Sequence, residues 1–248
     1  SFGVIKFTVD DRTYDVALPR KDRALADGQE TGRSHKDFVI EADPFLPLEK
    51  DLERRDFRCN SLALRLADGK VIDPFNGQAD LQQKIIRLTN PGSFPDDPLR
   101  VLRAARFASV LEFDIDREIY LAAKEIDLSG LSVERVNEEL FKILLQSPRP
   151  SLGLQEMLKL TVLKQLFPEL YRCSLSIQDS YFHPEKDEAG HHTVWAHLLL
   201  SVDQAKIISR LEGLEITREL ALLLAALYHD AGKPATADWE YKKDRLVI

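Results

Sequence analysis

The chain has 248 residues, of which 44% are hydrophobic and 30% charged, a composition typical of a soluble globular protein with one large or two to three small domains. It contains no run of the roughly 18 to 20 apolar residues that cross a bilayer, and no basic and apolar leader opens it. The net charge of −7 argues against broad coating of nucleic acid, and two cysteines cannot form a disulfide framework. We therefore expect a cytoplasmic protein without membrane contact, and any nucleic-acid contact should be confined to local basic patches.

Residues 1–20 alternate between apolar and polar side chains on both sides of Asp10-Asp11, which predicts two strands joined by a turn. Because the chain begins inside this pattern, we expect strands before Ser1 to be missing. Asp15 is out of phase with its apolar neighbours and should point to the opposite face. From the alternation alone, Asp15 is either a solvent-facing residue or part of a site.

Residues 21–44 contain few apolar side chains and predict a long mobile loop. A short helix over 48–52 should follow, then a hairpin over 62–72 around an Asp-Gly turn. The pattern next predicts a turn at 73–77 and a helix over 79–86. After about residue 92 the apolar spacing is helical throughout.

The stretch 54–61 places several charges directly before Leu62, Leu64 and Leu66, whose alternation predicts a half-buried strand. Charge at the edge of a buried element is costly unless it meets a partner. The stretch therefore forms either a nucleotide or phosphate site or an internal cluster of Arg–Asp salt bridges. The candidate residues are Arg54, Arg55, Asp56 and Asn60.

Asp96-Asp97-Pro98 is typical of a helix start. The helix that follows carries a row of arginines, which is either a solvated basic stripe or a surface that meets an anion or an acidic segment. This row, called the arginine row below, consists of Arg100, Arg103 and Arg106.

The next helices are predicted over 117–126 and from Ser132 to Leu145. Asp114 and Asp116 resemble a metal-binding pair, but Asp116 suits a helix N-cap and we interpret it so. The acidic residues of the second helix can pair within it or reach the arginine row.

Five of the six histidines lie after residue 180, and a continuous apolar helix over 220–227 ends in His229-Asp230. Adjacent His and Asp side chains at a helix end can bind a metal together with an earlier histidine. The alternative is a buried histidine that is hydrogen-bonded to the neighbouring carboxylate.

Taken together, these motifs resemble those of the class II tRNA nucleotidyltransferase and bacterial poly(A) polymerase family. Residues 54–61 resemble its RRDFTxNA motif, 96–103 its EDPLRxLR motif and 73–77 its IDPFxG turn. Residues 132–139 resemble the ERxxxE motif, and 14–20 match the strand that carries the third catalytic carboxylate. The chain departs from the pattern at Arg58, where the family has Thr, and at Asp96, where it has Glu, and each change can alter nucleotide preference.

The resemblance implies transfer of CMP and AMP from CTP and ATP to a tRNA 3′ terminus, with Mg²⁺ held by three carboxylates. It assigns Asp15 as the third carboxylate and expects the other two upstream of Ser1, so the 248 residues alone should be inactive. Asp97 and Arg100 would read the base edge. The implied nucleotide-binding residues are Arg54, Arg55, Asp56, Asn60, Asp97, Arg100, Arg103 and Arg106, and the implied RNA-binding residues of the neck are Glu134, Arg135 and Glu139.

From about residue 180 the chain is similar to the HD domain found in many of these enzymes. This similarity implies that His192, His229 and Asp230 ligate Ni²⁺, Mn²⁺ or Mg²⁺. The HD pattern needs a further downstream Asp, which the chain does not supply in a suitable place.

The predicted fold class is α+β: an incomplete nucleotidyltransferase head over 1–91 with a small mixed or antiparallel sheet, an all-α neck and body over 92–175, and an α-helical HD domain over 176–248. The leading functional hypothesis is CCA addition to tRNA. The alternatives are a poly(A) polymerase and an HD-domain metal-dependent phosphohydrolase. The sequence does not predict the oligomeric state.

Overall fold

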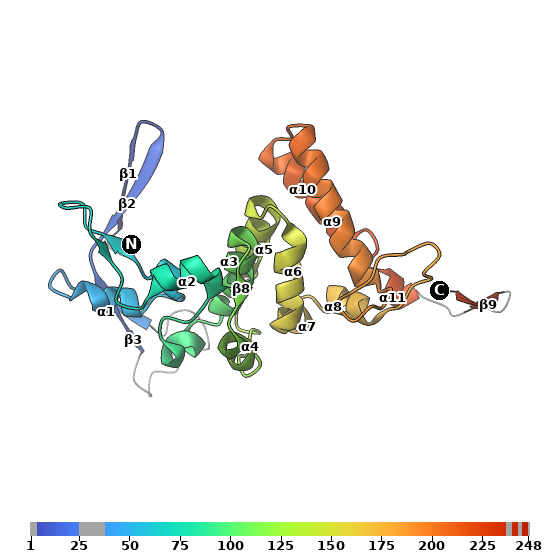
Figure 1. Cartoon of the computed structure of the whole chain (residues 1–248), viewed down its shortest axis with the longest axis horizontal. Coiled ribbons are helices and arrows are strands. Elements are labelled where there is room, and N and C mark those ends of the chain that lie inside the picture. Colours follow the sequence, from blue (N-terminus) through green and yellow to red (C-terminus); the bar gives the residue numbers. More distant parts are fainter. Residues whose placement is uncertain (1–3, 25–37, 237–239, 243–244, 248) are drawn as a thin grey trace. The chain divides into compact units, whose positions relative to one another are not determined.

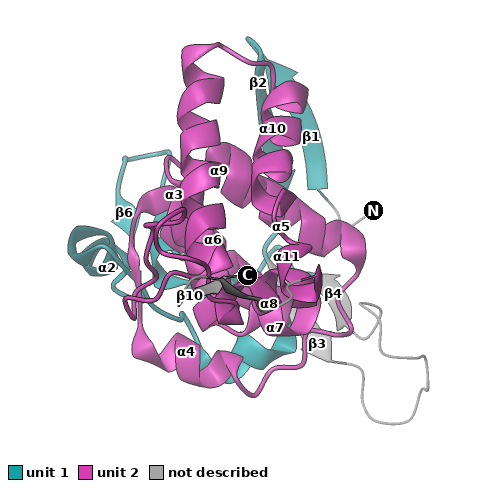
Figure 2. Cartoon of the chain, turned by 90° about the vertical axis from the view of Figure 1, so that its right-hand side faces the viewer, with its two compact units in different colours: residues 1–97 teal, residues 98–248 magenta. Residues whose placement is uncertain are grey.

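The computed structural model describes residues 4–24, 38–236, 240–242 and 245–247. It divides into two compact units, Ser1–Asp97 and Pro98–Ile248 (Figure 2). The first unit holds short helices and small sheets, and the second is mainly helical (Figure 1). The mixed α+β class predicted from the sequence is confirmed, whereas the finer division at residues 91 and 175 stays a prediction.

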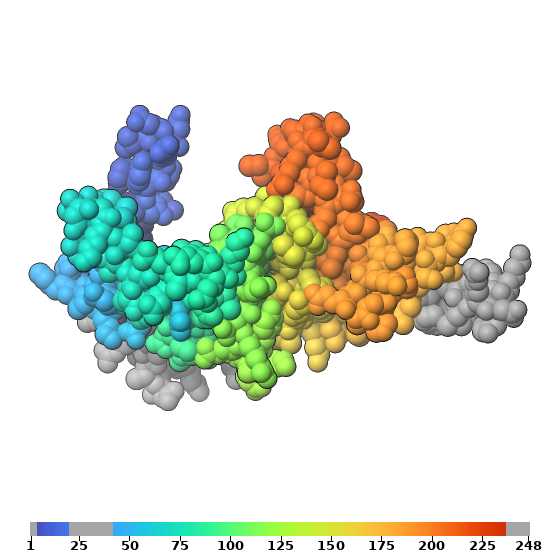
Figure 3. Space-filling view, in the orientation of Figure 1, coloured from blue at the N-terminus to red at the C-terminus, as the bar shows by residue number. Residues whose placement is uncertain are grey.

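The first unit begins with the antiparallel hairpin of β1 (Val4–Val9) and β2 (Arg12–Ala17). Its turn residues Asp10 and Asp11 have φ values of 47° and 59°, the left-handed conformation that fits tight hairpin turns. This hairpin is the dark blue segment of the space-filling view (Figure 3). Its register places five apolar side chains on one face, all of them exposed. These are Ile5, Phe7, Val9, Tyr14 and Val16.

The stretch 21–44, predicted to be a loop, contains most of β3 (Arg20–Ala24) and all of β4 (Phe38–Ala42), which pair in antiparallel register. The prediction of one continuous loop is therefore wrong at both ends. Its middle, residues 25–37, lies outside the described residues. Charged residues obscured β3, because a strand pairs through its backbone and needs no apolar alternation to do so.

The rest of the first unit packs around Leu52, Phe57, Ile86, Leu88 and Phe94, all at most 2% exposed. Helix α2 ends before the predicted limit of 86, because Lys84 adopts a left-handed conformation and stops it. The elements are α1 (Leu48–Glu53), the 3-10 helix η1 (Arg58–Asn60), β5 (Ala63–Leu64), β6 (Val71–Ile72), α2 (Gly77–Gln83), β7 (Ile85–Ile86) and the 3-10 helix η2 (Pro91–Asp96).

The predicted hairpin over 62–72 is present as the β5–β6 pair, but the half-buried strand is not. Leu64 is 58% exposed and Leu66 is 92% exposed. The strand is two residues long, and in the described part of the chain no layer covers these two leucines.

The second unit is mainly helical, and it contains the predicted helices after Pro98, near 117–126, from Ser132 to Leu145 and around 220–227. The long helix over 194–211 had no predicted limits. Asp116 caps its helix by accepting a hydrogen bond from the Glu118 N–H at 3.0 Å, as predicted. The elements are α3 (Leu99–Leu111), β8 (Asp114–Ile115), α4 (Arg117–Ala123), α5 (Val133–Gln146), α6 (Pro150–Lys159), α7 (Val162–Leu166), α8 (Pro168–Leu175), α9 (Val194–Leu211), α10 (Ile216–Tyr228), α11 (Lys233–Thr236), β9 (Glu240–Lys242) and β10 (Arg245–Val247). The short antiparallel pair β9–β10 was not predicted.

The buried amine of Lys206 joins three helices of the second unit. Its Nζ donates to the carbonyl oxygens of Leu144 and Leu145 in the last turn of α5, at 3.1 and 2.7 Å, and to Glu219 of α10 at 2.6 Å. A cation at a helix C-terminus satisfies carbonyls that have no partner within the helix. Among the helices that the structure describes, none has the length and apolar character of a membrane span.

Candidate functional site

The stretch 54–61 is held in place by backbone pairing with residues 87–89 of the same unit. Phe57 is fully buried and forms an isolated antiparallel bridge with Leu88. The Arg58 N–H donates to the Arg87 carbonyl at 3.0 Å, and the Thr89 N–H donates to the Asp56 carbonyl at 3.1 Å. The apolar anchor therefore fixes the polar side chains on either side of it.

Asp56 is the buried centre of this stretch, with 6% of its surface exposed. Its Oδ1 accepts hydrogen bonds from the Phe57 N–H at 3.0 Å and from Asn60 Nδ2 at 3.1 Å. These two donors hold the carboxylate in one orientation. The geometry brings together Asp56 and Asn60, and their role in nucleotide binding stays a prediction.

Arg54 and Arg55 both reach Asp51 of α1. The Arg54 guanidinium donates twice to Asp51 Oδ1, at 3.0 and 2.8 Å, and Arg55 lies 3.9 Å from its other oxygen. Arg55 also donates to the Asn60 carbonyl at 3.0 Å, and its buried Nε has no partner in the described part of the chain. An Arg–Asp salt-bridge cluster is thus present at Asp51, and Arg55 also reaches the backbone of Asn60, the residue that binds Asp56.

The turn at 73–77 packs against the backbone of Arg58 in the same stretch, a role that sequence reasoning missed. Asp73 accepts from the Gly77 N–H at 2.7 Å and the Gln78 N–H at 2.9 Å. Burial acts to raise the pKa of Asp73, but these hydrogen bonds outweigh it and hold that pKa below the ordinary value. A Cβ on Gly77 would overlap the Arg58 carbonyl oxygen and lie 2.9 Å from its carbon, so only glycine lets α2 approach η1.

Asp15 lies on β2, opposite Lys6 of β1, with 3.6 Å between the Lys6 amine and the Asp15 carboxylate. Its side chain is 57% exposed and points away from the face of Tyr14 and Val16, as the alternation predicted. Asp15 belongs to neither of the candidate metal groups found among the described His, Cys, Asp and Glu residues.

The arginine row meets its acidic partner within the second unit. Glu139 of α5 is 2% exposed, and its carboxylate lies 2.6 Å from Arg106 Nε and 4.0 Å from Arg103. The Arg106 guanidinium also stacks over the Phe107 ring, 4.3 Å from the centroid. Arg106 and Glu139 therefore form a structural ion pair, while Arg103 is held at its edge.

Of the other predicted residues, Asp97 and Arg100 are half-buried and flank the start of α3. Glu134 is exposed and Arg135 half-buried in the first turn of α5. The stretch 54–60 belongs to the first unit, and Arg100 to the second.

The histidines form a second cluster, where α9 and the end of α10 meet the loop before α9. His229 Nδ1 lies 2.9 Å from the Ala226 carbonyl, which can only accept, so Nδ1 carries the proton. The Nε2 atoms of His229 and His197 lie 3.2 Å apart, within hydrogen-bonding distance. On the other side of the His197 ring, Nδ1 lies 3.5 Å from Glu185 Oε1.

Asp230 is close to both of these histidines but forms an ion pair with a lysine. Its Oδ2 lies 3.4 Å from His229, 3.8 Å from His197 and 2.6 Å from the Lys233 amine. Burial acts to raise the pKa of Asp230, but the hydrogen bond and charge of Lys233 outweigh it and hold the pKa below its ordinary value. The ligand atoms of His197, His229 and Asp230 nevertheless lie within 4.8 Å of one another.

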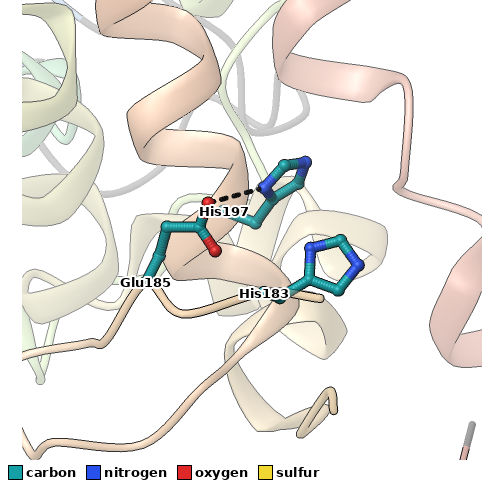
Figure 4. Close-up of side chains that lie close together, drawn as sticks. All are labelled: His183, Glu185 and His197. Atoms are coloured by element: carbon teal, nitrogen blue, oxygen red, sulfur yellow. Dashed lines mark hydrogen bonds and ion pairs between the residues drawn. The ribbon is translucent and has the colours of Figure 1, made fainter. Parts of the chain in front are cut away.

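His192 does not join this group. Its Nδ1 lies 3.1 Å from the carbonyls of both His183 and Glu185, so the ring organises the loop that carries them. Those two side chains instead converge on His197 from the loop side (Figure 4). His183, Glu185 and His197 were not predicted as ligands, and the useful signal was the position of His197 inside α9, one turn after the N-cap Thr193.

Comparison with known proteins matches two segments of the chain to family models. Residues 1–87 match the family model of the poly A polymerase head domain, and residues 112–173 match that of the probable RNA and SrmB-binding site of polymerase A. A multifunctional CCA protein of Stenotrophomonas maltophilia is 35% identical over 236 residues, covering 92% of this chain and 53% of the relative. One from Hahella chejuensis is 35% identical over 232 residues, covering 90% and 51%. The chain spans about half the length of the curated relatives it matches.

Solved structures show the same fold. One described as a tRNA-processing enzyme has a TM-score of 0.63 at 24% identity, over 94% of this chain and 58% of that one. The Thermotoga maritima CCA-adding enzyme complexed with tRNA has a TM-score of 0.53 at 26% identity, over 77% and 45%. Over residues 1–87 and 112–173, the chain therefore carries the head and RNA-binding domains of the class II CCA-adding enzyme and poly(A) polymerase family.

Proposed function

We propose that the protein is a cytoplasmic tRNA 3′-end nucleotidyltransferase that adds CMP and AMP from CTP and ATP. The observation that carries the proposal is the buried Asp56, fixed by Asn60 and preceded in the chain by Arg54 and Arg55, within the residues that match the head domain. A fixed carboxylate accepts from ribose hydroxyls, and guanidinium groups donate to phosphate oxygens. The buried Arg55 Nε supplies one such donor.

Base selection is assigned to Asp97 and Arg100 at the start of α3. A carboxylate and a guanidinium offer complementary acceptors and donors to the edge of a base, so protein groups replace a template strand. The RNA 3′ end would be bound by the neck, which includes Glu134 and Arg135 on α5. The proposed domains are the head over 1–91, the neck and body over 92–175 and an HD-type domain over 176–248.

Mg²⁺ chemistry in this family needs three carboxylates, and the described residues provide only Asp15, paired with Lys6. That pair does not by itself hold an ion, so no step is assigned to a metal here. The family resemblance places the other two carboxylates in a Gly-Gly-x-Val-Arg-Asp…Asp-x-Asp element.

Nucleotide binding by the chain itself tests the proposal. We would titrate the 248-residue chain with CTP and ATP by calorimetry and compare Asp56→Asn with Asp68→Asn, a control whose side chain is exposed in a turn. We expect Asp56→Asn to weaken both nucleotides by roughly tenfold, because a charge-assisted hydrogen bond contributes about 1.5–3 kcal/mol, and the control to match the wild type. Equal affinities in both variants, or no binding by a folded wild type, would overturn the proposed site.

The runner-up in the same chemistry is a poly(A) polymerase, which shares these motifs. Long A-tails on generic RNA in the presence of ATP alone would favour it. Addition limited to C and A on tRNA that lacks its CCA end favours the leading proposal.

A second candidate activity, an HD-type phosphohydrolase, is favoured by the grouping of His197, His229 and Asp230. Two imidazoles and a carboxylate match the ligands of divalent transition ions such as Ni²⁺ and Mn²⁺. Hydrolysis of a phosphomonoester or a 2′,3′-cyclic phosphate, lost in His229→Ala and retained in His191→Ala, would support it. Absence of turnover with each ion would rule it out for this chain.

A further inference from the structure

We propose that His183, Glu185 and the Nδ1 side of His197 form a binding site for a divalent transition-metal ion, separate from the His229–Asp230 pair on the Nε2 side of the same ring. One potential ligand atom from each of the three residues lies within 4.8 Å of the others. The rings of His183 and His197 stand edge to face, 4.8 Å apart between centroids, with the Glu185 carboxylate beside them (Figure 4).

Buried polar atoms without partners are the first reason to place a cation here. In the described part of the chain, His183 Nδ1 and Glu185 Oε2 are both buried and make no hydrogen bond. A buried polar atom that is left unsatisfied costs about 1–3 kcal/mol, and here the two atoms belong to two residues of one candidate metal group. A bound cation satisfies both at once.

The contact between His197 and Glu185 is the second reason. His197 Nδ1 lies 3.5 Å from Glu185 Oε1, which is longer than an ordinary hydrogen bond. A cation between the two atoms would be held by the lone pair of the neutral ring and by the charge of the carboxylate.

The donor chemistry selects the ion. Two imidazoles and one glutamate are the three protein ligands of several catalytic zinc sites, and this set also suits other first-row transition ions. The position of His192 adds support from outside the ligand set. Its ring donates to the carbonyls of His183 and Glu185 and thereby fixes the loop that presents both ligands.

The Lys233 ammonium is bound directly to the carboxylate of the His229–Asp230 pair, whereas at the proposed site its charge acts only from a distance, where after burial it lowers the pKa of His183. Asp230 already holds the Lys233 ammonium at 2.6 Å, and Lys233 also donates to Gln178 at 3.1 Å. A second cation at Asp230 would have to displace or repel this amine. Among the described residues, no ammonium group binds the Oε2 atom of Glu185, which makes no hydrogen bond.

The test is equilibrium dialysis of the 248-residue chain against Co²⁺, with visible absorption to report nitrogen and oxygen ligation. We expect one ion per chain in the wild type. Glu185→Gln and His183→Ala should each weaken binding at least tenfold, while Asp230→Asn retains the ion. Glu188→Gln and His191→Ala, exposed residues of the same loop, serve as matched controls and should bind as the wild type does.

Each outcome decides the proposal. A bound ion that is lost in Asp230→Asn but kept in Glu185→Gln overturns it, because the ion would then sit on the His229–Asp230 pair. Two ions, of which only one depends on Glu185, support it. If circular dichroism shows that a variant is unfolded, the wild type still tests the proposal. Absence of Co²⁺ uptake by the wild type at millimolar concentration contradicts the site. Nucleotide binding in the first unit is unaffected by any of these results.

Discussion

Glu139 determines how the arginine row is used. Its carboxylate is almost fully buried and binds Arg106 directly, with Arg103 and Lys142 at 4.0 and 3.3 Å. Residue patterns alone predicted an acidic partner for the row but did not specify which acid, because Glu138 and Glu139 differ only by one position in helical phase. The structure assigns the structural role to the buried one.

Glu139→Gln should therefore destabilise the second unit strongly. Its removal leaves the Arg106 guanidinium, 12% exposed, without its charge partner, and breaking a buried pair costs about 3–5 kcal/mol. Urea unfolding followed by circular dichroism measures the change. The control Glu138→Gln, with a side chain that is 66% exposed, should cost less than about 1 kcal/mol, and similar losses in both variants would refute the assignment.

Arg100→Ala tests base reading, and the readout is a ratio rather than an affinity. A purely structural loss weakens CTP and ATP alike, whereas loss of a base contact of about 1–3 kcal/mol changes their ratio by roughly tenfold. Calorimetric titration with each nucleotide gives both constants. We expect the ratio to shift in Arg100→Ala and to stay constant in Arg210→Ala on α9. An unchanged ratio in Arg100→Ala would remove the base-reading role.

At the scale of elements, the glycine of the 73–77 turn determines how closely two helices approach. Helix α2 passes so near η1 that Gly77 faces the Arg58 backbone and, at 3.2 Å, the Leu62 side chain. The motif was visible in the sequence, but its physical reason was not, because a close backbone approach leaves no trace in periodicity.

Gly77→Ala should displace η1 and with it Asn60. We expect a loss of about 1–3 kcal/mol in stability together with weaker nucleotide binding, measured by urea unfolding and calorimetry. The matched control is Gly69→Ala in the β5–β6 turn, where an added Cβ meets no atom within 4 Å but the φ of 69° brings backbone strain. Gly69→Ala should lower stability, but its folded molecules should bind nucleotide as tightly as those of the wild type. Normal nucleotide binding in folded Gly77→Ala would contradict the positioning role.

Helices were predicted well and small sheets less well, for a physical reason. The helix-capping residue Asp116, the start at Pro98 and the apolar run of α10 are local signals. Strands β3 and β10 depend on backbone pairing between segments with no apolar alternation. The metal candidates show the same limit, because His183 and Glu185 reach His197 through the conformation of a loop, which sequence spacing does not encode.

For the whole molecule, the two cysteines report separately on the two units. Burial, followed by the charges of Asp56 and Asp80, raises the pKa of Cys59 from 9.0 to about 11. Burial and then Asp230 raise that of Cys173 to the same value. Both thiols therefore stay protonated and poorly nucleophilic at neutral pH.

Because folding raises both thiol pKa values, their contribution to stability is complete below pH 9.0 and is lost as the pH rises through about 11. We expect slow alkylation by iodoacetamide at pH 8 in the native chain and fast alkylation in urea, with mass spectrometry resolving the two sites. The urea concentration at the midpoint of unfolding should decrease as the pH rises from 9 to 11. The decrease should be smaller in the double variant Cys59→Ala/Cys173→Ala. Rapid native alkylation at both sites would show that the thiols are not buried as described.

The most direct test of the central claim is incorporation of labelled C and A, from CTP and ATP with Mg²⁺, into a tRNA transcript that lacks its 3′ CCA end. We predict that the chain, joined to a head segment that supplies the two further carboxylates, restores the CCA end in sequence and that Asp56→Asn lowers the rate. A folded protein of this kind that adds neither C nor A to this tRNA would contradict the proposed function.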